Sequence, residues 1–276
     1  MLRTTLRHLL CFVLVVRQEQ ALGYIQQLET STTVLARMSP STLNDNSAEP
    51  ETITILGLGS LLSERSSRMT FPNLQHFRLG RVPNYRRVFG HPASIFFQRG
   101  IANKETLEFS SLSAEYVEEG YPGFVCTIYE VPNVDMMESG LPSQAYLERE
   151  EEFDIIAVPY VDLTTNETRQ GGILCARSTD TAYVERWGLE RFEQHYRKFG
   201  VDTIWDWPYS SGLRPCAPYL RHCALAAQKL GSVCYDSFLD ETYLVDRSTT
   251  VRSYIEANPQ VMSTEPPPEL AVRYGG

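Results

Sequence analysis

Short apolar stretches that alternate with polar positions predict a β-rich domain in the middle of the chain. The stretch over 52–56 alternates, is rich in β-branched residues and runs into a glycine-containing turn at 57–60. Such alternation is typical of a strand with one buried face. Further strands are predicted over 76–82, 85–90, 94–99, 107–112, 123–131, 154–163 and 172–177. Turn residues between them favour a substantial mixed or antiparallel sheet, and such a sheet can curl into a barrel.

Helical periodicity comes later and is confined to three stretches. A helix over 142–153 begins with a proline, which suits a first helical turn, and another over 189–199 ends before Gly200. The third, over 218–230, ends at Gly231 and has apolar residues at helical spacing: Leu220, Cys223, Ala224 and Ala227. Because these helices do not alternate strictly with the strands, the predicted fold class is α+β.

The two ends of the chain read differently from this domain. Residues 1–23 combine early basic residues, an apolar run over 9–16 and a small-x-small pattern at 21–23. This layout predicts a cleavable targeting segment for secretion or for import into an organelle; the alternative is an N-terminal helix packed on the domain. Residues 24–50 are predicted to be a linker and residues 258–276 a proline-rich loose tail. The folded domain is therefore expected over 51–257.

The composition of the chain limits the classes of partner that it is expected to bind. The chain has 276 residues, with 25 Lys and Arg against 34 Asp and Glu, a net charge of −9. This acidity argues against a nucleic-acid binder and against broad adhesion to anionic membranes. The longest apolar run is too short to cross a bilayer as a helix. Residues 78–87 mix arginines with an aromatic residue; an RNA-contacting strand is one interpretation, and exposed strand arginines fit so acidic a chain better.

Cysteine and histidine spacing gives no sign of a metal site. Outside the targeting segment the cysteines are odd in number and form no C-x-x-C pair; they are Cys126, Cys175, Cys216, Cys223 and Cys234. Small buried packing is their expected role. The histidines outside that segment, His76, His91, His195 and His222, match no metal-binding pattern.

The turn Gly57-Leu58-Gly59-Ser60 is the first candidate for chemistry. Leu62 stands where a dinucleotide fingerprint or a serine nucleophile elbow needs glycine, and the Gly-Lys-Ser/Thr of a phosphate loop is absent. The remaining interpretations are an ordinary turn after a strand, or a nest of backbone N–H groups that holds a carboxylate.

The second candidate is the acidic run at 148–152, which contains four glutamates and Arg149. A solvated helix face is the usual explanation of such a run. One carboxylate turned inward before the strand at 154 could instead act as a general base.

Taken in order, these segments resemble the γ-glutamylcyclotransferase-like family. Residues 56–62 (LGLGSLL) are similar to its Tyr-Gly-Ser-x-Leu loop, 99–102 to its Gly-Ile-Ala strand, and 123–131 to its Gly-x-Val-Tyr-x-Val strand. Residues 146–153 (YLEREEEF) stand where the family has a helix end with a glutamate, and 218–231 resemble its late Pro-x-Tyr helix. The resemblance implies a small mixed β-barrel with flanking helices, no metal and no organic cofactor. The implied activity is release of 5-oxoproline from a small γ-glutamyl substrate.

The same resemblance implies the site residues. The general acid/base is Glu151 by spacing from Leu147, or Glu150 by its place after Arg149; the spacing argument favours Glu151. Substrate contacts are implied for Tyr219 and for the loop residues Gly57, Leu58, Gly59, Ser60 and Leu61. Leu58 replaces the family's tyrosine, so a substrate-contacting hydroxyl is missing unless Tyr219 or Tyr209 supplies one. The competing hypothesis is therefore a non-catalytic binding or interaction domain on the same fold.

Overall fold

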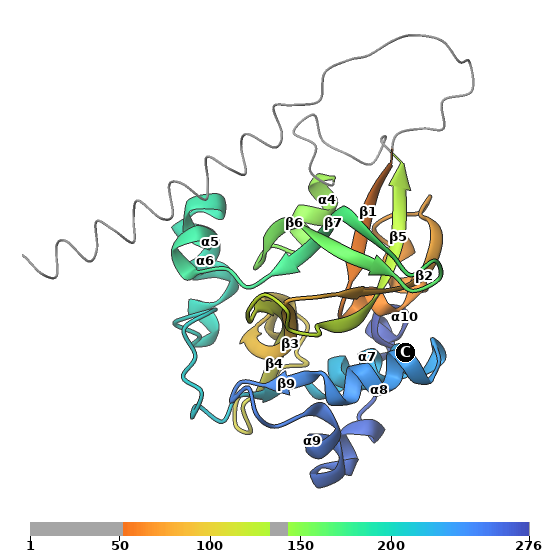
Figure 1. Cartoon of the computed structure of the whole chain (residues 1–276). Coiled ribbons are helices and arrows are strands. Elements are labelled where there is room, and N and C mark those ends of the chain that lie inside the picture. The colour runs from red at the N-terminus through yellow and green to blue at the C-terminus, as the bar shows by residue number, and fades with distance from the viewer. Residues whose placement is uncertain (1–51, 133–142, 276) are drawn as a thin grey trace, which may run out of the picture. The chain divides into compact units, whose positions relative to one another are not determined.

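In the computed structural model, which describes residues 52–132 and 143–275, five strands close into a small barrel (Figure 1). In spatial order they are β1 (Thr52–Gly57), β5 (Phe124–Pro132), β2 (Gln75–Val82), β6 (Asp154–Asp162) and β7 (Glu167–Ala176). Neighbours along this path are antiparallel, whereas β1 and β7 run parallel and close the ring, with Ile55 opposite Ile173. The barrel is therefore mixed, as predicted.

The sheet continues beyond the barrel through β7. β4 (Glu108–Tyr116) pairs in parallel with β7, and β3 (Tyr85–Pro92) pairs antiparallel with β4. Two short strands add to this extension: β9 (Thr242–Leu244) beside β3, and β8 (Arg214–Pro215) beside β4. These two strands were not predicted from the sequence.

Helices surround this sheet and complete an α+β fold, which confirms the predicted class. In Figure 1, α7 and α8 lie side by side below the barrel, and α5 and α6 lie together at another side. The α-helices are α2 (Glu64–Arg68), α3 (Ser94–Gln98), α4 (Gln144–Arg149), α5 (Asp180–Trp187), α6 (Leu189–His195), α7 (Ala217–Lys229), α8 (Ser232–Asp240), α9 (Val251–Ala257) and α10 (Ala271–Tyr274). Short 3-10 turns are η1 (Ser60–Leu62), η3 (Arg197–Phe199), η4 (Pro259–Ser263) and η5 (Pro268–Leu270).

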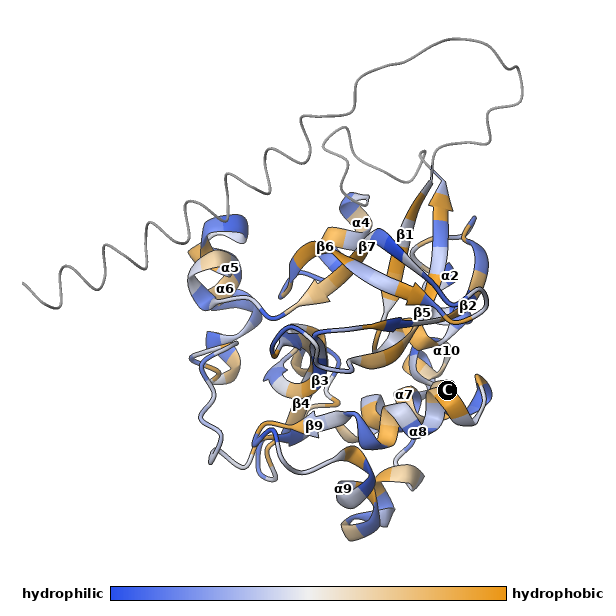
Figure 2. Cartoon of the chain, viewed as in Figure 1, coloured by the Kyte–Doolittle hydropathy of each residue, from blue (hydrophilic) through white to orange (hydrophobic). Residues whose placement is uncertain are grey.

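The core forms where the strands and α7 bury their apolar positions, which are orange in Figure 2. On α7 the residues predicted to face inward are all buried: Leu220, Cys223, Ala224 and Ala227. The five described cysteines are buried and free, which confirms their expected packing role. The predicted targeting segment at 1–23 and linker at 24–50 lie outside the described residues.

One predicted strand is a helix. Residues 94–99 were expected to be extended, yet Ser94–Gln98 form α3. The apolar run at 95–97 is too short for periodicity to distinguish the two structures. A half-buried strand would turn successive side chains to opposite faces, whereas here the consecutive Phe96 and Phe97 are both buried.

The C-terminal residues are packed, and the prediction of a loose tail over 258–276 is wrong. Val261, Leu270 and Tyr274 are buried, and η4 and α10 contact α7. The prolines misled the prediction because they lie in the first turns of η4 and η5, where the fixed proline φ angle suits a helix start. The folded unit therefore extends past residue 257 to the end of the described chain.

Candidate functional site

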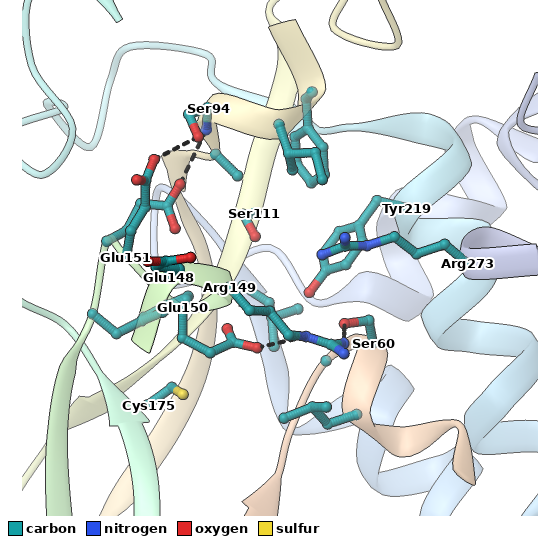
Figure 3. Close-up of a pocket in the computed structure, with 18 of the residues that line it drawn as sticks. Ser60, Ser94, Ser111, Glu148, Arg149, Glu150, Glu151, Cys175, Tyr219 and Arg273 are labelled. Carbon is teal, nitrogen blue, oxygen red and sulfur yellow. Dashed lines mark hydrogen bonds and ion pairs between the residues drawn. The ribbon is translucent and has the colours of Figure 1, made fainter. Parts of the chain in front are cut away.

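A cavity of about 320 Å³ lies at the end of β1, among the loops and helices that cover this side of the barrel (Figure 3). Its wall combines the turn after β1, the start of α3 and the residues that follow α4. Tyr219 of α7 and Arg273 and Tyr274 of α10 also line it, together with residues of β4 and α6. Segments that are distant in the sequence therefore meet around one space.

The turn after β1 lies at this cavity, and it contains the loop at 56–62 that resembles the family motif. Leu58, Gly59, Ser60 and Leu61 line it, whereas Gly57 does not. The Gly57 carbonyl instead accepts a hydrogen bond of 3.3 Å from the Thr127 hydroxyl, so this residue belongs to the packing of β1 on β5. The substrate contact that the resemblance implies for Gly57 stays a prediction, without support from the cavity wall.

Arg149 ties this turn to the acidic run. Its guanidinium donates to the Ser60 hydroxyl at 3.0 Å and forms an ion pair of 3.0 Å with Glu150. The same side chain donates to the Ser66 carbonyl at 2.9 Å and to the Thr70 hydroxyl at 2.7 Å. Five donated hydrogen bonds, counting the one to the Ser66 hydroxyl, fix its position. Figure 3 shows the Glu150 carboxylate turned toward this arginine and Ser60.

Glu151 also lines the cavity, but both of its carboxylate oxygens are engaged. Oε1 accepts from the Ser94 hydroxyl at 2.7 Å and contacts His195 Nδ1 at 2.8 Å. Oε2 pairs with Arg191 at 2.6 Å. In Figure 3 this side chain is directed toward Ser94 on α3 and not toward Ser60. Glu151 therefore connects α3 to α6.

The spacing argument that favoured Glu151 does not apply here. It assumed that the helix over 142–153 continues through the glutamates, so that four residues from Leu147 return to one face. The helix α4 ends at Arg149, with Glu150 as its C-cap. The side chains of Glu150 and Glu151 therefore point in different directions from the end of α4. Glu150 is the one that Arg149 links to Ser60.

Glu152 completes the acidic run inside the protein. It accepts hydrogen bonds from the Tyr196 hydroxyl at 2.6 Å and from the Ser94 amide at 3.0 Å. Burial, and then the neighbouring charge of Glu151, raise the pKa of Glu152 to about 8, although its two hydrogen bonds oppose the shift. Glu150, Glu151 and Glu152 are therefore, in turn, paired with Arg149, paired with Arg191 and buried as an acid, so these three glutamates do not form a solvated helix face.

Tyr219 presents its hydroxyl to the cavity beside Gly59. Its ring packs against Phe89, Phe96 and Tyr274, with centroids 5.1–6.2 Å apart. Burial raises the pKa of Tyr219 well above its usual value, so the hydroxyl keeps its proton and can donate it in a hydrogen bond. Tyr219 therefore lines the cavity, and its contact with a substrate stays a prediction.

Leu58 gives the cavity an apolar surface at the position where the resemblance implies a tyrosine. It is buried and lines the cavity. Of the two tyrosines considered as replacements, Tyr219 lines the cavity, whereas Tyr209 is 62% exposed and its ring lies under Arg247. The hydroxyl-bearing residues of the cavity wall are Ser60, Ser94, Tyr219, Tyr274 and the buried Ser111 of β4.

Several residues of this wall were not found by sequence reasoning: Ser94, Ser111, Arg191, His195 and Arg273. None lies in a motif, because each reaches the cavity from a different part of the chain. The arginines at 78–87 also differ from expectation. Arg78 is paired with Glu130 and Asp162, and Arg87 is fully buried, so these are not simply exposed strand arginines.

Comparisons with known proteins give weak likenesses. No protein-family model and no curated protein matches the sequence. The chain is similar to a solved structure named "Gamma-glutamyl cyclotransferase", with 12% identity and a TM-score of 0.37 over 79% of this chain and 90% of that one. An uncharacterized human protein is 13% identical, with a TM-score of 0.31 over 57% of this chain and 92% of its own. A protein from Arabidopsis thaliana is 11% identical, with a TM-score of 0.27 over 56% and 86%.

These likenesses say nothing about chemistry at such low identities and TM-scores, and the barrel assignment rests on the strand pairing described above. Within residues 52–132 and 143–275, no cluster of His, Cys, Asp and Glu is arranged to hold a metal ion. In the same part of the chain, no helix has the length and apolar character needed to cross a membrane.

Proposed function

We propose that this protein releases 5-oxoproline from a γ-glutamyl compound, with Glu150 as the general acid/base. One observation carries the proposal: Glu150, Ser60 and Tyr219 border a single cavity, and Arg149 links the first two. The loop at 56–62 and the helix end at 146–153, which both resemble the family, are far apart in the sequence. Their meeting around one cavity is what a γ-glutamyl-type site requires.

The reaction needs only groups that this chain supplies. The substrate's α-amine nitrogen attacks its own γ-carbonyl carbon, a C–N bond closes the five-membered ring, and the bond to the leaving amine breaks. Glu150 accepts the proton released by the attacking amine and returns it to the leaving nitrogen. Because the attack is intramolecular, holding the substrate in a folded conformation supplies much of the rate increase.

The turn after β1 is proposed to hold the substrate's α-carboxylate. The Ser60 hydroxyl and the backbone of the turn offer donors there, and Arg149 adds a positive charge beside them. The protonated Tyr219 hydroxyl is a further donor on the same wall. The apolar Leu58 then contacts the methylene groups of the glutamyl chain.

A non-catalytic binding domain is the second candidate. The observation that favours it is Leu58, which removes a hydroxyl from the position where the family has one. In this alternative the cavity holds a γ-glutamyl compound without turnover. The two candidates differ in product release and not in the fold.

The test measures 5-oxoproline release by the purified full chain from a panel of γ-glutamyl amino acids, γ-glutamyl-lysine and glutathione. Glu150→Gln is expected to lower kcat/KM at least about 100-fold. Glu185→Gln, at an exposed position of α5 outside the cavity wall, is the control and is expected to stay close to wild type. Loss of release in a folded Glu151→Gln protein, with Glu150→Gln active, would move the base to Glu151. No release by the folded protein from any compound would favour the binding domain.

A further inference from the structure

Two arginines at the cavity have no acidic partner among the described residues. They are Arg273 on α10 and Arg99, which follows α3. The other two cavity arginines each have a glutamate partner: Arg149 pairs with Glu150, and Arg191 pairs with Glu151. Glu148 and Glu152 also line the cavity, but within the described residues no ion pair joins either of them to Arg99 or Arg273.

Arg273 is directed at the cavity from a fixed position. Figure 3 shows its side chain extending from the C-terminal helix toward the space that Ser111 and Tyr219 line. The adjacent Tyr274 is buried and packs against Tyr219, at 5.9 Å, and His222, at 5.7 Å between ring centroids. Because Tyr274 anchors α10, Arg273 is held at the wall and does not sweep through solvent.

One hydrogen-bond donor of Arg273 has no acceptor among the described residues. Its Nε atom is buried and has no hydrogen-bond partner in the described part of the chain, and its guanidinium lies 5.6 Å from the Tyr274 ring. A buried donor without an acceptor is unfavourable unless a ligand supplies one. A carboxylate matches the planar fork of a guanidinium and forms paired hydrogen bonds with it.

We infer that Arg273 binds a carboxylate on the leaving portion of the substrate, with Arg99 at the exposed rim adding attraction. This inference rests on the proposed function, because the glutamyl α-carboxylate is assigned to the turn at Ser60, beside Arg149. The site thereby selects γ-glutamyl amino acids and peptides over γ-glutamyl amines that lack this second carboxylate. The C-terminal helix is then a specificity element.

The test uses two compounds that differ only in this carboxylate, γ-glutamyl-alanine and γ-glutamyl-ethylamide. Binding is measured by isothermal titration calorimetry on the full chain carrying Glu150→Gln, and release of 5-oxoproline is measured separately with Glu150 in place. We expect γ-glutamyl-alanine to bind about 10- to 100-fold more tightly, as for a hydrogen-bonded charge pair. Arg273→Gln is expected to bring the ratio near one, and Arg273→Lys to restore part of it.

Arg65→Gln is the matched control, because Arg65 is an exposed arginine on α2 that is not part of the cavity wall. It should leave the binding ratio as it is. Equal binding of the two compounds, no binding of either, or a ratio that Arg273→Gln does not change would overturn the inference. If the ratio depends on Arg273 but no compound yields 5-oxoproline, the carboxylate site stands and the proposed function fails.

Discussion

Gly59 and the Tyr219 hydroxyl approach each other so closely that a β-carbon on residue 59 would overlap the hydroxyl oxygen. The contact joins the turn after β1 to α7, which comes much later in the chain. Tyr219 cannot easily withdraw, because its ring is buried among Phe89, Phe96 and Tyr274. Glycine at position 59 is therefore required by a tertiary contact at the cavity itself.

Gly59→Ala should consequently lower the free energy of unfolding by about 1–3 kcal/mol, as overpacking of a buried site does. Adding Tyr219→Phe to this variant removes the overlapping oxygen and should restore part of the loss. Urea denaturation of the two single variants and the double variant measures the coupling. Additive effects of the two substitutions would contradict the contact.

Glu151→Gln should destabilise the protein by about 1–3 kcal/mol, because Arg191 and His195 would lose their carboxylate partner. The effect is kept moderate by solvent, since 29% of the Arg191 side chain is exposed. Glu148→Gln is the control, and as an exposed substitution it should change the unfolding free energy by no more than about 0.5 kcal/mol. Equal stabilities of the two variants would show that Glu151 does not hold α3 and α6 together.

Glu152 should make stability depend on pH. Its pKa is raised from 4.5 to about 8 in the folded protein, so the folded chain binds this proton more tightly than the unfolded chain does. The stabilisation is present at acidic pH and is lost as the pH rises from 4.5 to 8. The Tm should fall over this range, and it should fall less in Glu152→Gln.

The measurement is a thermal melt of wild type and variant at several pH values between 5 and 8. Glu185→Gln, on the exposed surface of α5, is the control and should keep the wild-type slope. If the Tm of Glu152→Gln fell with pH as steeply as that of wild type, the group that titrates would be a residue other than Glu152.

The packed C-terminus gives a further prediction. Tyr274→Ala should lower the free energy of unfolding by about 3–5 kcal/mol, because it removes a buried ring that contacts Phe96, Tyr219 and His222. Glu269→Ala, at an exposed position of η5, should have little effect. Chemical denaturation monitored by fluorescence separates the two variants. If Tyr274→Ala left the free energy of unfolding unchanged, the C-terminal residues would be a loose tail after all.

Elements with strong local patterns were predicted well. The strands at 52–56, 85–90, 123–131 and 154–163 and the helix at 218–230 all appear, with small shifts at their ends. Their periodicity is set by which side chains must face the core, and that information lies in adjacent residues. The stretch at 94–99 failed because its apolar run is short enough to suit a strand or a helix, and only its neighbours decide.

The sequence by itself determined the α+β class, the burial of the cysteines, and the two segments from which the candidate site is built. Only the tertiary structure decided which glutamate of the run at 148–152 is associated with Ser60, because that depends on α4 ending at Arg149. It also brought Arg273 to the cavity from residues expected to be loose. The physical reason is that ion pairs and buried contacts join residues far apart in the chain, and no local period records them.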